Sequence, residues 1–476
     1  MTVPERAQKD SNMAVEVKVL TLNVWGIPGI SKDREARMEA IVQQLVTGNE
    51  EYDFVFLQEV WSKADYTFIA SKVNKVLPYS HTFYSGCVGS GLCVLSRSPI
   101  TEVHYHRFAL NGYPHKLLHG DWWGGKGVAL CRTVRHGVPM LLATTHSVSP
   151  LPPSLSLSPQ FISSPQHQRM GVCVRLCGSV PGKEVEEKIP IVNKFHAEYN
   201  PQEDEYVHHR LTQAFETSEL IRFAKKTEEV LICAGDFNCI PTDFAYRMVK
   251  FYAGLVDTYT DSPCKTPGSC GETNQTPANS YTNVKTLITN PSGNRIDYIF
   301  YQASSTHKVK TKLCDQPWPQ RVPQRDFSFS DHEAVRAIIT ITPVKDEDAT
   351  ENITELQAQT DALLEGAAVC EQGLKKVACN RRLYLTLAGL VLGLELAYLA
   401  VLSLDLSLGA LMGLSVLSMA GMLLLAYLLH MGTVFSHLEY SGVQAARLAI
   451  KCHLEKLTER NAQVEQERKH SSSFIK

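Results

Sequence analysis

The chain has 476 residues, with 47 Lys or Arg and 49 Asp or Glu, so its formal net charge is −2. Its length allows about three domains, or one large enzyme domain with additions. The balanced charge excludes a polybasic nucleic-acid binder, and the 44% hydrophobic content excludes a disordered or collagen-like polymer.

The first residues, MTVPERAQKDSN, are polar and charged. They lack the apolar stretch of a secretory signal peptide, so we expect the domain that follows to stay in the cytosol. The 13 cysteines are scattered, without a Cys-x-x-Cys pair or a dense cluster. This distribution predicts reduced thiols rather than a zinc ribbon or a disulfide framework.

Residues 14–342 alternate strand-like apolar runs with helical patterns, which predicts one folded domain. In chain order the strands are expected at VKVLTLNVWG, YDFVFLQEVW, GLCVLSRSPI, KGVALCRTV, PMLLATTH, VLICAGDFN, RIDYIFY and HEAVRAIITI. Helices are expected at RMEAIVQQLV and HHRLTQAFETSELIRFAKK. This order favours an α/β fold in which two packed sheets are flanked by helices.

One stretch inside this domain, residues 147–194, breaks the pattern. It contains VSPLPPSLSLSPQFISSPQHQ, which is rich in Ser and Pro and has neither a helical nor a strand period. We therefore predict a disordered insertion here.

The segment HGDWWGGKG has two possible interpretations. Trp122 and Trp123 stand close to glycines and could enter a lipid interface, with Lys126 meeting a lipid phosphate. A loop packed beneath the functional site would have the same sequence features.

The C-terminal part is predicted to be a membrane anchor. Residues 343–382 are acidic and then weakly helical, and we interpret them as a tether. Residues 383–430 hold two apolar runs, each near the roughly 20 residues that cross a bilayer. A pair of core helices in a soluble domain is the alternative. Glu395, inside the first run, is expected to face a partner or an oligomer interface.

Basic residues flank this pair of runs on both sides, which predicts that both termini and the folded domain of residues 14–342 lie in the cytosol. The endoplasmic reticulum, the nuclear envelope and the plasma membrane all stay open. Residues 431–476 are expected to form a cytosolic amphipathic helical tail, which could serve a membrane surface, self-association into a homo-oligomer, or packing. Its apolar residues at heptad-like spacing include Val443, Ile450, Leu454 and Leu457.

Polar residues stand at or beside the ends of the predicted strands, where a sheet could gather them at one edge. They are Asn23, Glu59, His146, Asp236, Asn238, Asp297, Asp331 and His332. Each motif alone has a structural explanation, since Gly-Asp-x-Asn is typical of a turn and Ser-Asp-His of a helix cap. Their ordered succession favours a catalytic site.

The chemistry that suits these residues is phosphodiester hydrolysis. A phosphodiester anion repels nucleophiles, so the site needs a hard cation such as Mg²⁺, which prefers carboxylate and amide oxygens. Glu59 with Asn23 is the predicted ligand pair. His332, beside Asp331, is the predicted general base for water.

Other residues of the set suit the positioning of the reactants. Asp236 and Asn238 would hold the water and a phosphate oxygen in line, and His146 would donate to the developing charge.

The motifs LNVWG, QEVW, TTH, GDFN, RIDY and SDH, in this order, resemble the endonuclease/exonuclease/phosphatase superfamily. The fold of that superfamily is a four-layer α/β sandwich, and its members use Mg²⁺ to cleave phosphoesters. Within it, LNVWGIP, EVWS, GSGLCVLSRSPI, LNGYPHKLLHGDWWGGKGV, FHAEYN and the paired apolar runs resemble the two-span neutral sphingomyelinases. The resemblance covers nearly the whole chain except residues 147–194.

The resemblance implies Mg²⁺-dependent hydrolysis of sphingomyelin in the membrane to ceramide and phosphocholine, with Glu59 as metal ligand and His332 as proton acceptor. The remaining family site positions match Asn23, His146, Asp236, Asn238, Asp297 and Asp331. The sequence departs from the family where a continuous Thr-His-Leu-His-Ala-Glu-Tyr-Asn run is expected. Here the insertion separates His146 from residues 195–200, which could disturb the catalytic geometry.

Two alternatives stay open. Another phosphodiesterase of the same fold could carry the same metal and base residues. DNA is disfavoured as its substrate because residues 21–341 show no basic cluster that would form a groove. The second alternative is a membrane scaffold that the insertion has inactivated.

Overall fold

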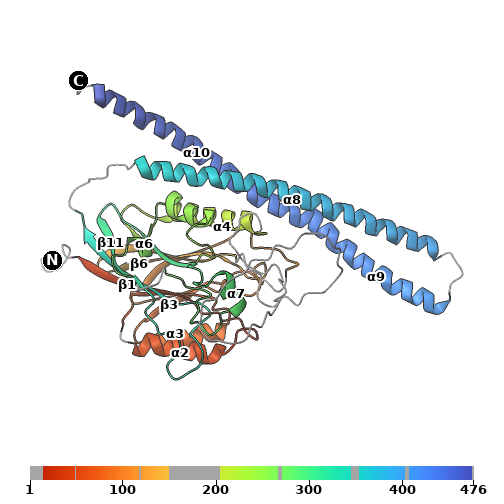
Figure 1. The fold of residues 1–476 in the computed structure, drawn as a ribbon, viewed down its shortest axis with the longest axis horizontal. Helices are drawn as coiled ribbons and strands as arrows, with labels where there is room; N and C mark the ends of the chain where they lie inside the picture. The colour runs from red at the N-terminus through yellow and green to blue at the C-terminus, as the bar shows by residue number, and fades with distance from the viewer. Residues whose placement is uncertain are drawn as a thin grey trace, which may run out of the picture.

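The computed structural model describes residues 14–48, 50–116, 120–148, 204–265, 271–344, 353–402 and 407–473. Within these ranges, two six-stranded sheets pack face to face and helices cover their outer faces. Two long helices extend past the domain on one side (Figure 1).

The first sheet has the strand order β11-β12-β1-β2-β4-β3. Its strands are β1 (Val15–Asn23), β2 (Phe54–Gln58), β3 (Tyr79–Thr82), β4 (Cys93–Ser96), β11 (His307–Asp315) and β12 (Val335–Pro343). Strands β1 and β2 run parallel, and Asn23 is in register with Gln58. Their carboxyl ends therefore meet at one edge of the sheet.

The second sheet has the strand order β5-β6-β7-β8-β10-β9. Its strands are β5 (Ile100–Arg107), β6 (Gly127–Arg135), β7 (Val138–His146), β8 (Val230–Asp236), β9 (Val256–Asp257) and β10 (Asp297–Gln302). Strands β7 and β8 run parallel, with His146 opposite Asp236, and the antiparallel β10 places Asp297 opposite Asp236. Three polar side chains thus stand side by side at this edge.

Helices complete the outer layers (Figure 1). α2 (Arg34–Thr47) and α3 (Lys63–Val73) cover the first sheet, and α4 (Val207–Ala224) with the short α5 (Phe244–Arg247) and η3 (Met248–Tyr252) covers the second. Two further short helices, α6 (Thr258–Asp261) and α7 (Val284–Thr289), lie in connecting segments. The predicted four-layer α/β sandwich is confirmed.

The strands that the sequence did not predict as such lie mostly at sheet edges. β5 is largely exposed, and β11 alternates buried apolar residues with lysines. Edge strands carry charge and little continuous apolar sequence, so an apolar-run criterion passes over them.

The C-terminal segment is more helical than predicted. α8 (Ile353–Val401) runs through most of the predicted tether into the first apolar run, and α9 (Leu408–His430) forms the second. Each helix contains a stretch that is long and apolar enough to cross a membrane, by length and composition. Only 6% of the most apolar 18-residue stretch in each is buried. The domain bounds proposed from the sequence stay predictions.

The tail, η4 (Met431–Phe435) followed by α10 (Ser436–Ser473), returns along α8 to the catalytic domain (Figure 1). Val443 and Ile450 are buried against α4, and Leu454 and Leu457 pack at the margin of the same core. Of the three roles left open for these apolar residues, the structure shows packing.

Glu395 finds a partner within the pair of apolar helices. Ser418 on α9 donates to its carboxylate at 2.5 Å, and a Cβ at Gly421 would lie 2.0 Å from that carboxylate. Gly421 thus leaves space for the acidic side chain between the two helices. A homo-oligomer through these helices stays a prediction.

The predicted insertion is described only at its start. Ser147 and Val148 continue from β7 and are buried, and residues 149–194 lie outside the described residues. Residues 195–200 of the family run do so as well.

Candidate active site

The polar residues predicted from strand ends meet at the shared edge of the two sheets. Asn23 ends β1, Glu59 follows β2, His146 ends β7, Asp236 ends β8 and Asp297 begins β10. Asn238, Asp331 and His332 lie in the adjoining loops, after β8 and before β12. Residues spread over some three hundred positions of sequence therefore form one site.

Asn23 links the two sheets at this site. Its Nδ2 donates to Glu59 Oε1 at 2.9 Å and to Asp236 Oδ2 at 3.0 Å, while its Oδ1 accepts from the Trp25 N–H at 2.9 Å. The backbone donor fixes the amide orientation. Asn23 thus turns nitrogen toward the carboxylates here, and its predicted role as a metal ligand would require the amide to rotate.

Glu59 is held in an unusual backbone conformation. Its φ is 61°, in the left-handed region that is unfavourable for residues other than glycine. Such strain is concentrated at functional sites, where the surrounding structure maintains it. Burial, and then the nearby Asp331, raise the pKa of the Glu59 carboxyl.

His332 is oriented by Asp297. His332 Nδ1 lies 2.8 Å from Asp297 Oδ2, and Nε2 lies 4.0 Å from Asp236 Oδ2. An ionised carboxylate can only accept, so Nδ1 carries a proton and Nε2 is the atom that can exchange one. Burial alone would lower the pKa of His332, but the charge and hydrogen bond of Asp297 raise it above the ordinary value.

A buried lysine completes the opposite side of the site. Lys126 Nζ lies 2.7 Å from Asp121 Oδ1 and 3.1 Å from His146 Nε2, and it donates to the Ser147 carbonyl at 2.9 Å. An ammonium only donates, so His146 Nε2 accepts and the ring is neutral. Burial, and then Lys126, lower the pKa of His146 well below its ordinary value.

Lys126 therefore presents the proton-bearing cation at the position where the sequence predicted donation by His146. From the sequence, Lys126 has only a possible lipid contact as its predicted role, and Asp121 has no predicted role. The available sequence signal for Lys126 was its position directly before the apolar run GVALC. A lysine next to a buried strand is itself expected to be buried, and a buried lysine needs a partner.

Asn238 and Asp331 stand at the margins. Asn238 donates its backbone N–H to Asp236 Oδ1 at 2.9 Å and its Nδ2 to the Ser147 carbonyl at 2.9 Å. It shapes the turn that presents Asp236. Asp331 accepts from Ser330 Oγ at 3.2 Å, and burial raises its pKa.

The donor set fits a divalent cation. Burial, and then Asp297, raise the pKa of Asp236 to about 7, and the pKa values of Glu59 and Asp331 are raised too. The carboxylates thus lack sufficient positive charge around them. Asp297 Oδ1 is buried without a hydrogen-bond partner among the described residues, and ligand atoms of Asp236, Asp297 and His332 lie within 4.8 Å of one another.

Hard oxygen ligands in this number suit Mg²⁺. A cation site, a histidine with an available nitrogen and a buried ammonium together could hydrolyse a phosphodiester.

Comparisons with known proteins agree with this chemistry. Residues 20–332 match the model of the endonuclease/exonuclease/phosphatase family. A putative neutral sphingomyelinase of Drosophila melanogaster is 35% identical over 325 residues, covering 68% of this chain and 61% of that protein. Sphingomyelin phosphodiesterase 2 of Homo sapiens is 31% identical over 394 residues, covering 82% and 80%.

An inositol phosphosphingolipids phospholipase C of Schizosaccharomyces pombe is 29% identical over 348 residues, covering 69% of each chain. The matched region thus spans less than two thirds of the fly relative's length and four fifths of the human relative's.

Proposed function

Because this chain belongs to the endonuclease/exonuclease/phosphatase family and is a homologue of sphingomyelin phosphodiesterases, we propose that it hydrolyses sphingomyelin to ceramide and phosphocholine. The observation that carries the proposal is the hydrogen-bonded line from Glu59 through Asn23 to Asp236, with His332 at 4.0 Å from that last carboxylate. This proximity of the candidate metal ligand to the candidate base supports the proposal.

Proton transfer is assigned to His332. Its Nε2 would take a proton from the attacking water, while Asp297 holds Nδ1–H and stabilises the positive charge that develops on the ring. Asp236, next to Nε2, would orient that water.

Charge on the phosphate is assigned to the other side of the site. Glu59 would hold Mg²⁺, and Asn23 would join it once its amide rotates to turn Oδ1 toward the ion. The ion, when bound, would neutralise phosphate charge and polarise the phosphorus centre. Lys126 would supply positive charge beside a phosphoryl oxygen. Its three N–H groups already meet Asp121, Ser147 and His146, so direct donation to the phosphate would replace the 3.1 Å contact with His146. Asn238 would hold the Asp236 turn in place.

The membrane is the proposed location of the substrate. The most apolar windows of α8 and α9 are 6% buried, whereas core helices of a soluble domain would be mostly covered. We assign them to a transmembrane hairpin with the catalytic domain and both termini on the cytosolic side, as the flanking basic residues predict.

The alternative of an inactive scaffold has less support. The insertion follows His146 closely, yet His146 keeps its register with Asp236 and its contact with Lys126. The other alternative, a phosphodiesterase of the same fold with a different substrate, is tested by comparing which lipids the protein cleaves.

The deciding experiment uses the full chain in phosphatidylcholine vesicles with or without sphingomyelin. We expect phosphocholine release that requires sphingomyelin and Mg²⁺, stops on chelation, and is lost in Glu59→Gln. Release only from vesicles that carry inositol phosphosphingolipids would indicate a different headgroup. A folded chain that is inactive on both lipids would support the scaffold.

A further inference from the structure

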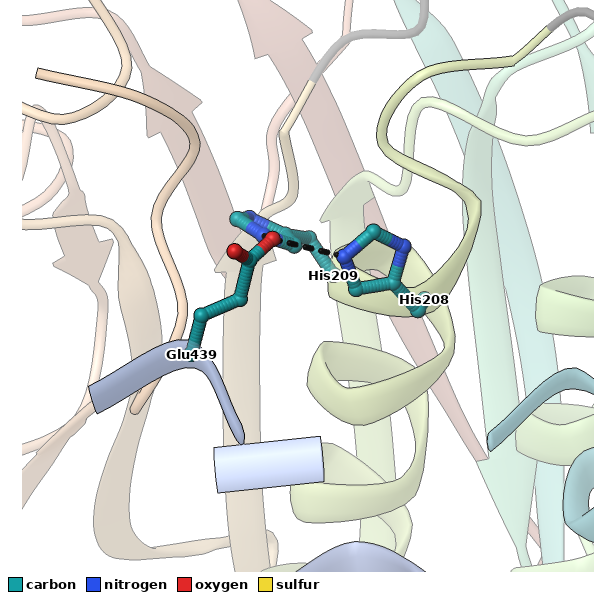
Figure 2. A group of neighbouring side chains, drawn as sticks. All are labelled: His208, His209 and Glu439. Carbon is teal, nitrogen blue, oxygen red and sulfur yellow. Dashed lines mark hydrogen bonds and ion pairs between the residues drawn. The ribbon is translucent and has the colours of Figure 1, made fainter. Parts of the chain in front are cut away.

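A second buried polar cluster lies outside the active site, where the C-terminal tail meets the catalytic domain (Figure 2). Glu439 on α10 points toward His208 and His209 at the start of α4. Its Oε1 accepts from His208 Nε2 at 2.8 Å, from His209 Nε2 at 3.0 Å and from the Tyr113 hydroxyl at 3.0 Å. The side chains of Glu439, His208 and His209 are at most 3% exposed.

Two histidines and a glutamate at this spacing also resemble a metal site, but the protonation of His209 argues against one. The Gly112 N–H donates to His209 Nδ1 at 3.0 Å. That nitrogen must therefore be the acceptor, and the ring proton sits on Nε2. A protonated Nε2 donates to Glu439 and cannot bind a cation, so the cluster is a hydrogen-bonded clasp.

The charges agree with this assignment. Burial lowers the pKa of His208 to about 4, so the ring is neutral. Burial would raise the pKa of Glu439, but the hydrogen bonds from His208 and His209 hold it below the ordinary value. A buried carboxylate with three donors is well satisfied.

The clasp continues toward the active site through Gly112. This residue has a φ of +83°, and a Cβ there would lie 3.3 Å from the Cβ of Asp121 and 3.3 Å from a ring carbon of Tyr206. Asp121 in turn pairs with Lys126 at 2.7 Å. Gly112, which donates to His209, therefore lies close beside Asp121, the partner of the lysine of the site.

The same loop rests on the base of the apolar helices. Tyr113 and Tyr206 share an apolar cluster with Met431 and Phe435 of η4, and Trp122 packs at its margin. Tyr113 is the residue that also donates to Glu439. The described parts of this loop, residues 108–116 and 120–126, therefore contact α10, η4 and the catalytic centre.

We propose that Glu439 is a positioning residue for the reaction: docking of α10 through Glu439 and His209 holds the loop that presents Asp121 and Lys126. This inference rests on the proposed function. It makes the membrane anchor part of the machinery that orders the active site, rather than a passive tether.

The experiment compares the full-length chain with Glu439→Gln in sphingomyelin vesicles. Because a displaced catalytic group costs up to about 100-fold in rate, we expect kcat to fall about 10- to 100-fold with a much smaller change in KM. The matched control is Glu371→Gln, which breaks the exposed contact of α8 with Arg447 on α10. It should leave kcat unchanged.

A double-mutant cycle separates positioning from general loss of structure. If Glu439 acts through Asp121, Glu439→Gln in an Asp121→Asn background should cost little further activity. Independent, multiplying effects or an unchanged kcat in Glu439→Gln would overturn the proposal. So would Zn²⁺ bound by the wild-type chain and lost in Glu439→Gln.

Two further measurements cover failure of folding or of activity. Tyr113→Phe is the substitute if Glu439→Gln does not fold, because it removes only one of the three donors to Glu439. Tyr113→Phe should also reduce kcat, by a smaller factor than the one expected for Glu439→Gln. If wild-type protein does not cleave sphingomyelin, the proposed function fails, and hydrogen exchange of residues 108–126 still decides. Exchange should be faster in Glu439→Gln and unchanged in Glu371→Gln, and equal rates in all three proteins would refute the clasp.

Discussion

His332 Nδ1 lies 2.8 Å from Asp297 Oδ2, and this hydrogen bond joins the proposed base to the carboxylate that orients it. Asp297 is in register with Asp236 in the neighbouring strand, so the sheet itself fixes the carboxylate that orients the imidazole. The loop before β12 supplies the ring, and the strand supplies its support.

Asp297→Asn should lower kcat by about 100-fold or more, because an amide neither fixes the Nδ1–H tautomer nor stabilises a charged ring. Asp297 raises the pKa of His332, so its removal lowers that pKa and the acid limb of the rate profile should move to lower pH. Steady-state rates in sphingomyelin vesicles from pH 5 to 9 provide the measurement. An unshifted acid limb would mean that another group titrates there.

Lys126→Met should abolish most activity and also destabilise the fold by about 3 to 5 kcal/mol, since Asp121 is left buried without its cation. The two effects can be separated. Adding Asp121→Leu should restore much of the free energy of unfolding but none of the turnover, measured by denaturant titration and phosphocholine release. Recovery of turnover in the double variant would show that Lys126 has only a structural role.

The sequence predicted the central strands well because each is an apolar run buried on both faces, as in β2 and β8. It also predicted that the polar residues at the ends of β1, β2, β7 and β8 lie at one edge, since parallel strands bring their carboxyl ends together. The catalytic roles of these residues stay predictions. The edge strands β5 and β11 were not predicted because many of their residues are polar or charged and face solvent, so neither strand is a continuous apolar run.

Other features depend on tertiary contacts that a local sequence pattern indicates weakly or not at all. From the sequence, Asp121 and Lys126 are typical of an exposed loop, whereas in the structure both are buried and form an ion pair. Glu439 lies in a segment that the sequence predicts to be an amphipathic helix, and its contacts with His208 and His209 arise only because α10 docks on α4. The protonation of His209, which decides between a metal site and a clasp, is set by the backbone N–H of Gly112.

Removing residues 149–194 should leave activity intact and stabilise the fold by about 1 to 2 kcal/mol, because a shorter connection loses less entropy on closure. The deletion begins after Ser147 and Val148, because the Ser147 carbonyl accepts from Lys126 and Asn238. Turnover and denaturant unfolding of both forms check this expectation. A clear gain in turnover on deletion would show that the insertion hinders the site.

Acidification should loosen the clasp through His208. Its folded-state pKa of about 4 lies below the ordinary value of 6.5. Between these two pH values His208 is therefore protonated in the unfolded chain and neutral in the folded chain. This depressed histidine pKa contributes stability that is present above pH 6.5 and lost as pH falls toward 4. The loss amounts to about 2 kcal/mol between pH 7 and pH 5.

His208→Gln isolates this contribution from other titrating groups. The variant should be less stable than wild type at pH 7, since a donor to Glu439 is altered, and the gap should narrow as pH falls to 5. Denaturant titrations at both pH values measure it. A gap that stays constant would mean that His208 titrates equally in the folded and unfolded chains, which would contradict its burial as a neutral ring in the clasp.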